Sequence, residues 1–344
     1  MQRGCCILLS RIAGSTGEVV AVEAGLLAVE RCENAAAGAG ACVGAGEDSG
    51  AEVSHRLDAF EDATAAGLRA LPDWRGKASL AFEWKHVRER HGPLRGTWHL
   101  RLADGSSMSM PRGSRMSWAV AATGYWDRHL VDFVESFVAP RTLVLDIGAS
   151  LGLWAVPLGR IVRERDGLLR CFEPNPDNIP WLSSNIEANG LRGVTEIHAF
   201  AVGAHKGSAY LGFREPGGGN GAIRPDADAA VPVEVKRIDD SDFPMPVSFV
   251  KMDVEGFELE VMRGASELLE RDRPVIFGEF SAIWLRERGE DLPAHLRGLS
   301  AIGYDIFAVE QHRSSRWRPN DVASLRRLRP PFATAGENLL LVPS

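Results

Sequence analysis

The sequence is poor in cysteine, and its cysteines are not spaced as a metal site or a disulfide framework. Of the 344 residues, five are cysteines: Cys5 and Cys6 are adjacent, Cys32 and Cys42 lie in a weakly patterned region, and Cys171 lies in an apolar run. Without a C-x-x-C pair, neither a zinc site nor a disulfide network is expected. We therefore predict no metal ligands and a reduced compartment, the cytoplasm.

Long apolar runs are also lacking. No stretch reaches the ~18 uncharged apolar residues that a membrane-spanning helix needs. The apolar stretch from Cys5 to Leu9 is broken by Ser10 and Arg11 and is too short for the apolar region of a secretory signal. We expect no membrane insertion.

An excess of positive charge is the third absence. The chain has 46 acidic and 39 basic residues and a calculated pI of about 5.8. Such a chain has no general positive field to gather nucleic acid, so we expect no nucleic-acid partner. Arginines do gather in residues 313–329, which is typical of a solvated surface but would also suit an anionic acceptor. Nothing in the composition sets the oligomeric state.

Composition and turn signals predict three parts. Residues 1–70 contain a stretch, 35–50, that is mostly alanine and glycine, and such small side chains bury too little apolar area to order the backbone. We predict a disordered extension there, with order beginning near Trp74. Residues 71–123 form a small accessory segment with a β-hairpin at Thr97–Pro111 around an Asp-Gly turn. Residues 124–344 form the main domain, which opens with a helix over Trp126–Val138.

From Thr142 onward, strand-like runs alternate with amphipathic helical stretches, which is typical of βαβ units and a parallel sheet. Two final strand-like runs with no helix between them predict an antiparallel hairpin at the sheet edge. The sequence thus predicts a Rossmann-like α/β fold with a mostly parallel, seven-stranded sheet. The expected strands are Leu143–Ile147, Leu168–Phe172, Thr195–Val202, Ser248–Met252, Val275–Phe280, Tyr304–Val309 and Asn338–Val342, and the expected helices are Leu153–Arg165, Asn178–Asn189, Phe257–Arg271 and Leu292–Ile302.

The junction after the first strand carries an acid and two glycines: Asp146, Gly148 and Gly152. Glycines let the backbone and the helix N–H groups approach a ligand closely. In a dinucleotide fold this turn holds a pyrophosphate, which a carboxylate would repel. Asp146 suits a cationic ligand instead, such as the ammonium and sulfonium end of S-adenosylmethionine. A plain strand–turn–helix with packing glycines is the alternative.

The second strand ends at Glu173, where open α/β sheets place an acid that binds ribose hydroxyls. The alternative is that Glu173 caps the following helix, with Pro174 and Pro176 shaping its start.

The fourth strand leads into Lys251-Met-Asp-Val-Glu-Gly-Phe-Glu258. Asp253 or Glu255 could take a proton from an acceptor hydroxyl or hold the acceptor in line with a methyl group. Glu258 fits the start of the next helix, where an acid is favourable. Lys251 fits an ion pair with a neighbouring acid. Glu279, at the end of the fifth strand, is a weaker base candidate. The glycine-rich residues 216–222 could be a lid or a loose connection.

At these residues the chain resembles the FkbM family of methyltransferases, from about Gly124 to the C-terminus. The resemblance implies a class I methyltransferase fold, S-adenosyl-L-methionine as methyl donor, and O-methylation of a hydroxyl on a sugar, glycan or other natural product. The segments that carry it are Asp146–Gly152, Glu173–Pro176, Ala201–Gly203, Gly219–Asn220 and above all Lys251–Glu258.

The resemblance also implies roles for individual residues. Those that would bind the cofactor are Asp146, Gly148, Ser150 and Gly152 at its methionine end and Glu173 at its ribose, while Asp253 and Glu255 would face the transfer site. The family usually has asparagine where this chain has Ser150, and the shorter serine loses one amide partner.

Two other functions fit a related sheet: an NAD(P)-dependent oxidoreductase and a non-catalytic nucleoside-binding module. The acid in the first turn argues against the oxidoreductase. We expect a methyltransferase that acts on a small-molecule or glycan acceptor.

Overall fold

The chain is described by a computed structural model over residues 61–63, 65–70, 77–89, 94–213, 221–224, 231–310, 324–332 and 337–344. It divides into two compact units, residues 1–70 and 71–344. In the first unit, residues 61–63 and 65–70 are helical, whereas the sequence predicted no order before Trp74; the rest of the predicted extension lies outside the described residues. All features below belong to the second unit.

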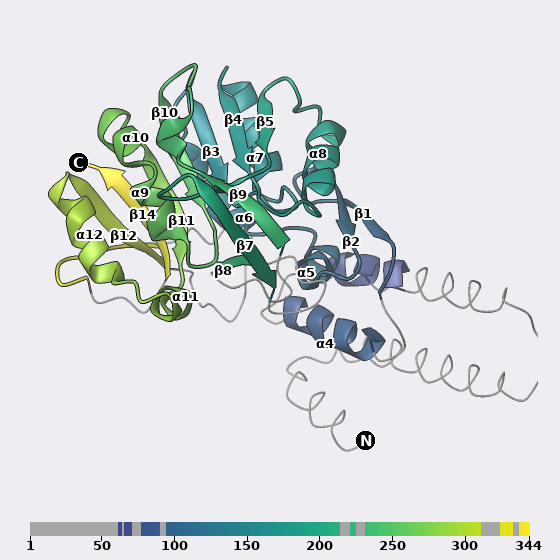
Figure 1. Cartoon of the computed structure of the whole chain (residues 1–344). Coiled ribbons are helices and arrows are strands. Elements are labelled where there is room, and N and C mark those ends of the chain that lie inside the picture. The colour runs from purple at the N-terminus through teal and green to yellow at the C-terminus, as the bar shows by residue number, and fades with distance from the viewer. Residues whose placement is uncertain are drawn as a thin grey trace, which may run out of the picture. The chain divides into compact units, whose positions relative to one another are not determined.

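A mostly parallel sheet forms the centre of this unit (Figure 1). Its parallel strands lie in the order β11, β10, β3, β4, β5, and β14, β12 and β13 continue the sheet beyond β11 with antiparallel pairing. The bounds are β3 Leu143–Ile147, β4 Leu168–Phe172, β5 Thr195–His198, β10 Val247–Met252, β11 Val275–Phe280, β12 Tyr304–Glu310, β13 Ser324–Arg327 and β14 Glu337–Pro343. The predicted Rossmann-like fold is confirmed.

The order of the strands indicates the edge of the sheet where a ligand would bind. From β3 the chain runs outward to β4 and β5, then returns to β10 on the other side of β3. Ligands of open α/β sheets bind outside the carboxyl ends of the strands at such a reversal. All five residues of β3 are buried, as expected for a parallel strand covered on both faces.

The sheet has eight strands where the sequence predicted seven. The added strand is β13, which pairs with β12 and includes Arg326 and Arg327 from the arginine-rich stretch. The predicted antiparallel pairing of β12 with β14 is confirmed, but β14 lies between β12 and β11. Residues 311–323, with the other arginines of that stretch apart from Arg329, lie outside the described residues.

One predicted strand, Thr195–Val202, is split between two sheets. Its first half is β5, and its second half, β6 (Ala201–Val202), pairs with β9 (Val231–Lys236) in a four-stranded sheet that also contains β7 (Gly207–Phe213) and β8 (Gly221–Arg224). Residues 214–220 are not described, so whether the glycine-rich segment acts as a lid stays a prediction.

Helices connect the parallel strands as predicted, with one break. The predicted helix Phe257–Arg271 consists of α9 (Glu258–Arg263) and α10 (Ser266–Arg271). It breaks at Gly264, where an added Cβ would overlap the carbonyl of Gly203. The other helices are α6 Arg128–Val134 followed by η1 Glu135–Phe137, α7 Ala155–Glu164, α8 Ile179–Ala188, η2 Ile238–Asp240, α11 Ala282–Glu287 and α12 Leu292–Ala301.

The accessory segment packs around two tryptophans. The predicted hairpin is confirmed as β1 (Thr97–Arg101) paired with β2 (Ser107–Pro111). Trp98 of β1 meets Trp118 edge to face at 5.4 Å between ring centroids. Trp118 belongs to α5 (Arg115–Thr123), which the sequence did not predict, nor did it predict α4 (Lys77–Glu89). Of the helices that the structure describes, none is long and apolar enough to cross a membrane.

Candidate active site

The residues singled out from the sequence meet at the carboxyl ends of β3, β4 and β10. The glycine loop, residues 148–152, follows β3, Glu173 follows β4, and Asp253 follows β10. Strand pairing brings the three ends together, because Ile147 is in register with both Phe172 and Met252.

The glycine loop has a backbone that side chains would obstruct. Gly148 and Gly152 have φ of 84° and 92°, and Ser150 has a φ of 48°. This left-handed region is open to glycine and costs energy for most other residues. At Gly148 a Cβ would overlap the carbonyl oxygen of Asp253. The loop therefore lies directly against the turn that follows β10.

Glu173 holds the glycine loop from the side of β4. Its Oε2 accepts from the backbone N–H of Ser150 at 2.7 Å, and its Oε1 accepts from the N–H of Asn175 at 2.8 Å and the amide of Asn178 at 3.3 Å. Burial raises the pKa of Glu173, and these hydrogen bonds oppose the rise. The carboxylate thus supports the loop and the start of α8, and its remaining lone pairs leave capacity for a ligand hydroxyl.

A lysine joins the ends of β3 and β10. Lys251 Nζ lies 3.5 Å from Asp146 Oδ1 and 3.7 Å from Asp253 Oδ2, and donates to the carbonyl of Gly148 at 3.3 Å. Burial lowers the pKa of Lys251, but the attraction of Asp146 and Asp253 outweighs it and raises that pKa. The ion-pair role predicted for Lys251 is confirmed.

The two predicted transfer residues differ in their surroundings. The side chain of Asp253 is 41% exposed. Glu255 has a φ of 51° within a tight turn, which is followed by Gly256 at a φ of 89°. Glu258 is completely buried, and its Oε1 accepts from Gly256 N–H at 3.0 Å, so this glutamate fixes the turn as well as starting α9.

Further carboxylates surround Asp253. Burial, with repulsion from Asp253, Glu255 and Asp127, raises the pKa of Glu279 to about 7. Burial and repulsion from Asp253 raise the pKa of Asp127 to about 6. The sequence gave no weight to Asp127, which lies in the first turn of the predicted helix Trp126–Val138 and directly before the observed α6. Among the described residues, no group of three or more His, Cys, Asp or Glu side chains has the arrangement of a metal site.

The first junction has the unmatched polar atoms that a bound cofactor would satisfy. Both carboxylate oxygens of Asp146 and the hydroxyl of Ser150 are buried without a hydrogen-bond partner in the described structure. Lys251 is too far from Asp146 for a strong hydrogen bond. Buried polar groups normally find partners, so these atoms fit a ligand that carries N–H and O–H groups, as S-adenosylmethionine does.

The strand order fits the fold of a methyltransferase. The sequence profile of the methyltransferase FkbM domain matches residues 146–306. Residues 146–306 are thus similar to an FkbM methyltransferase domain, which confirms the resemblance seen in the sequence, and this similarity implies a cofactor of the S-adenosylmethionine type. Among curated proteins, none matches the chain.

Solved structures of methyltransferases show distant similarity. The methyltransferase FkbM from Methylobacillus flagellatus KT is 16% identical, with a TM-score of 0.38; the similarity covers 76% of this chain and 57% of that protein. An rRNA methylase from Streptococcus thermophilus is 10% identical (TM-score 0.38, covering 62% and 93%). A precorrin-6y C5,15-methyltransferase from Geobacter metallireducens GS-15 is 11% identical (TM-score 0.33, covering 63% and 88%). The chain thus spans little more than half of the first of these proteins.

Proposed function

We propose that this protein is an S-adenosyl-L-methionine-dependent O-methyltransferase whose acceptor is a hydroxyl of a sugar, glycan or other natural product. The observation that carries the proposal is the position of Asp253, whose backbone carbonyl lies against Gly148 of the glycine loop and whose accessible carboxylate lies 3.7 Å from Lys251 Nζ. A carboxylate at that place can orient an acceptor hydroxyl and take its proton. A cytoplasmic location remains a prediction.

The residues that would hold the cofactor are those of the first two junctions. Asp146 and Ser150 would meet its methionine end, Gly148 and Gly152 would allow its close approach, and Glu173 would accept from its ribose. When bound, the cofactor supplies an electrophilic methyl group on a sulfonium.

Asp253 is the first candidate for the base, and Glu255 the second. Lys251 fixes the position of Asp253 and keeps a positive charge beside it. An acceptor hydroxyl that donates to Asp253 is oriented toward the glycine loop and loses its proton to the carboxylate as the new bond forms.

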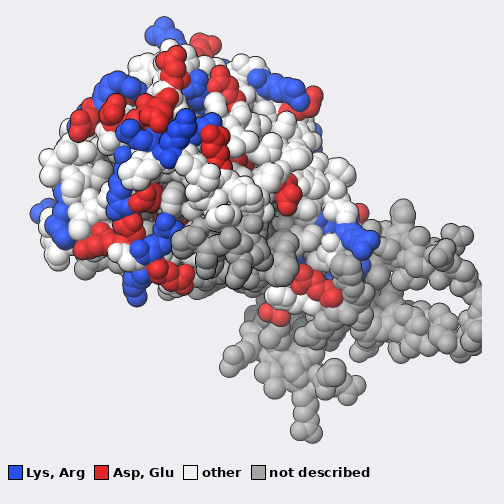
Figure 2. Space-filling view, in the orientation of Figure 1, with Lys and Arg blue, Asp and Glu red and all other residues white. Residues whose placement is uncertain are grey.

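Surface charge supports a small or glycan acceptor rather than nucleic acid. On the face shown in Figure 2, basic and acidic side chains are interspersed, and neither sign covers a large area of the described residues. Binding to a nucleic-acid backbone normally uses a basic surface.

Cofactor-binding measurements and a methyl-transfer assay test the proposal. Calorimetry with S-adenosyl-L-methionine should show binding to the wild-type protein, whereas NAD⁺ should leave the melting temperature unchanged. Transfer of labelled methyl from the cofactor to a panel of neutral, amino and acidic sugar glycosides then reports the acceptor class. Absence of cofactor binding would refute the proposal.

Substitution separates the roles of the carboxylates. Asp253→Asn should leave cofactor affinity nearly unchanged and lower turnover by ~10²-fold or more, the effect of a lost general base. Asp242→Asn, at an exposed position outside the site, is the matched control. Undiminished turnover in Asp253→Asn would remove this residue from the mechanism.

Glu279 is a third base candidate, and its pKa of about 7 supports it more than the sequence did. If it takes the proton, activity should rise with pH through about 7, because its carboxyl must lose a proton first. Glu279→Gln should then abolish that rise. A pH profile that is the same in both proteins would leave the role to Asp253.

A further inference from the structure

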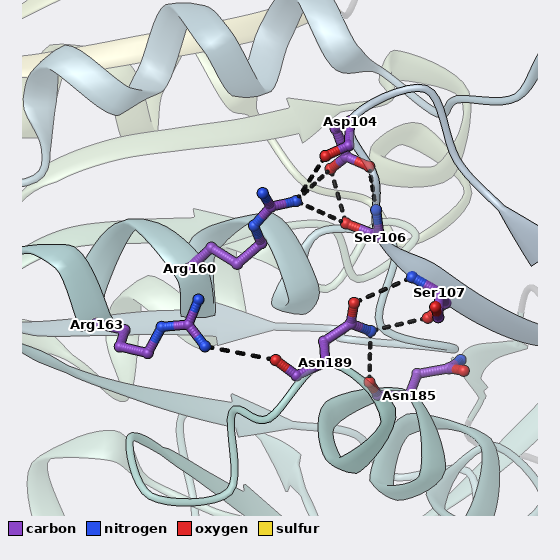
Figure 3. Close-up of polar contacts among 7 residues, drawn as sticks. All are labelled: Asp104, Ser106, Ser107, Arg160, Arg163, Asn185 and Asn189. Atoms are coloured by element: carbon purple, nitrogen blue, oxygen red, sulfur yellow. Dashed lines mark hydrogen bonds and ion pairs between the residues drawn. The ribbon is translucent and has the colours of Figure 1, made fainter.

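The accessory hairpin is held to the main domain by polar side chains of two helices. From α7, Arg160 Nη1 donates to the carbonyl of Asp104 at 3.0 Å and to Ser106 Oγ at 3.1 Å, both at the turn of the hairpin. Asn185 of α8 and Asn189, which directly follows α8, bond the backbone of β2. Figure 3 shows the contact of Asn189 with Ser107 and the contacts of Arg160. The helices α7 and α8 follow β3 and β4, the strands whose ends carry the cofactor residues.

Asn185 and Asn189 bind β2 much as a neighbouring strand would. Asn189 accepts from the N–H of Ser107 at 3.0 Å and donates to its carbonyl at 2.8 Å. Asn185 makes the same pair of bonds with Ser109, at 2.7 and 3.1 Å. Alternate residues of a strand point their backbone groups to the same side, and residues four apart on a helix lie on one face. The two amides therefore match the strand in register.

Asn185 also bonds the glycine loop. Its amide donates to the carbonyl of Leu151 at 2.8 Å, so both amide hydrogens and the carbonyl oxygen of Asn185 are in use. The residue is completely buried. The loop residue before Leu151 is Ser150, whose N–H is bonded by Glu173. One side chain thus connects β2 to the loop that faces the cofactor.

Polar anchors matter here because apolar packing under the hairpin is incomplete. A cavity of about 210 Å³ lies between the hairpin and the helices, with Leu102 and Met108 on one side and Val131 and Ile161 on the other. Such a gap forfeits part of the dispersion energy that close packing would supply. The docking of the hairpin therefore depends on Arg160, Asn185 and Asn189 more than a packed interface would.

We propose that Asn185 is a positioning residue through which the docked hairpin holds the glycine loop in the shape that binds the cofactor. The amide of Asn185 can face Leu151 only while its other bonds to Ser109 fix its orientation. Loosening the hairpin then weakens cofactor binding without touching a cofactor-binding residue. This inference rests on the proposed function, since it takes the glycine loop as the cofactor site.

A matched pair of substitutions on one helix tests it. In Asn185→Asp, carboxylate oxygens face the carbonyls of Leu151 and Ser109, so the bonds that Asn185 donates to the loop and to the hairpin are both lost. In Asn189→Asp, the bonds donated to Ser107 and to the helix backbone are lost, and the loop keeps its own contact. We expect Kd for S-adenosyl-L-methionine to rise ~10-fold or more in Asn185→Asp and by a smaller factor in Asn189→Asp, as for buried hydrogen bonds left unmade.

Two further readouts separate positioning from general destabilisation. Hydrogen exchange without ligand should become faster in residues 148–152 of Asn185→Asp, while the amides of β11 stay as protected as in the wild type. At saturating cofactor, kcat should be close to that of the wild type, with the effect confined to KM for the cofactor.

The outcomes separate a failure of the coupling between hairpin and loop from a failure of the proposed function. If Asn189→Asp frees the hairpin, as seen by faster exchange in β2, and Kd stays unchanged, the hairpin is not coupled to the loop. Equal cofactor affinity in Asn185→Asp and the wild type would also overturn the inference. If the wild type binds no cofactor, the proposed function fails, whereas the exchange data on the loop still test the contact itself.

Discussion

The carboxyl edge of the sheet has two halves, the ends of β3 and β4 and the ends of β10 and β11. The two halves use their polar side chains differently. At the ends of β3 and β4, the backbone of the glycine loop is hydrogen-bonded by Glu173, by Asn185 of α8 and by Lys251, which reaches it from β10. A loop held at three points needs little reorganisation when it binds a ligand, and such preorganisation favours affinity.

At β10 and β11 the polar groups are carboxylates that repel one another. Asp127, Asp253, Glu255 and Glu279 lie close enough for their charges to raise the pKa of Glu279. Perturbed carboxylates gathered in a crevice are typical of functional sites rather than of stabilising networks. The comparison agrees with the proposed function, in which the first group of strand ends would bind the cofactor and the second would move a proton.

Gly148→Ala should cause the largest loss in the free energy of unfolding, because it forces the glycine loop away from the turn after β10. The new Cβ would overlap the carbonyl of Asp253, and the residue has a φ of 84°. We expect a loss of more than about 4 kcal/mol in the free energy of unfolding, or failure to fold. Urea denaturation measures it. Gly298→Ala, in the exposed middle of α12 with open space around it, should instead raise stability by about 1 kcal/mol.

Lys251→Met removes the charge that joins the halves. Asp146, which is completely buried, would keep no cation beside it, and breaking a buried ion pair from one side costs about 3–5 kcal/mol. The loss should be smaller at pH 5 than at pH 8, since a protonated Asp146 no longer needs the ammonium. In the control, Lys236→Met removes a surface pair with Glu234, and its cost should stay below about 1 kcal/mol. Equal losses in the two variants would contradict the bridging role of Lys251.

Glu258→Gln tests whether the buried Glu258, which follows β10, makes stability depend on pH. Burial raises the pKa of Glu258 to about 7. A folded-state pKa above the unfolded value means that the folded protein binds more protons, so this group's contribution to stability is lost as pH rises from about 4.5 to about 7. Glutamine keeps the acceptor for Gly256 N–H without the charge. The variant should therefore be more stable than the wild type above pH 7, by up to about 3 kcal/mol.

Urea titrations at several pH values measure that difference, and Glu270→Gln, at an exposed position on α10, serves as the control. A stability difference that does not vary between pH 5 and 8 would contradict a buried, titrating Glu258.

The sequence predicted the strand ends well because parallel strands obey local patterns. β3, β4 and β11 have the predicted bounds, and so Asp146 and Glu173 could be placed beside one another. The split of Thr195–Val202 could not be predicted, because both halves are strand-like and only tertiary pairing assigns them to different sheets. The helix α5 was missed because Ser117 to Ala122 are all buried, which leaves no amphipathic period.

The residues missed at the site depend on contacts that are distant in the sequence. Asn185 meets Ser109 across 76 positions, and a lone asparagine in a helical pattern carries no signal of such a partner. Asp127 lies in the first turn of a predicted helix, where an acid is ordinary. Its proximity to Asp253 exists only once the sheet has formed.

The position of β14 has a consequence for how the protein is made. Residues 337–343 lie between β11 and β12, so while the ribosome is still adding earlier residues, the outer edge of β11 has no strand beside it. An unpaired edge of this kind can recruit other chains. The nascent protein is therefore most exposed to aggregation in the interval between synthesis of β11 and synthesis of β14.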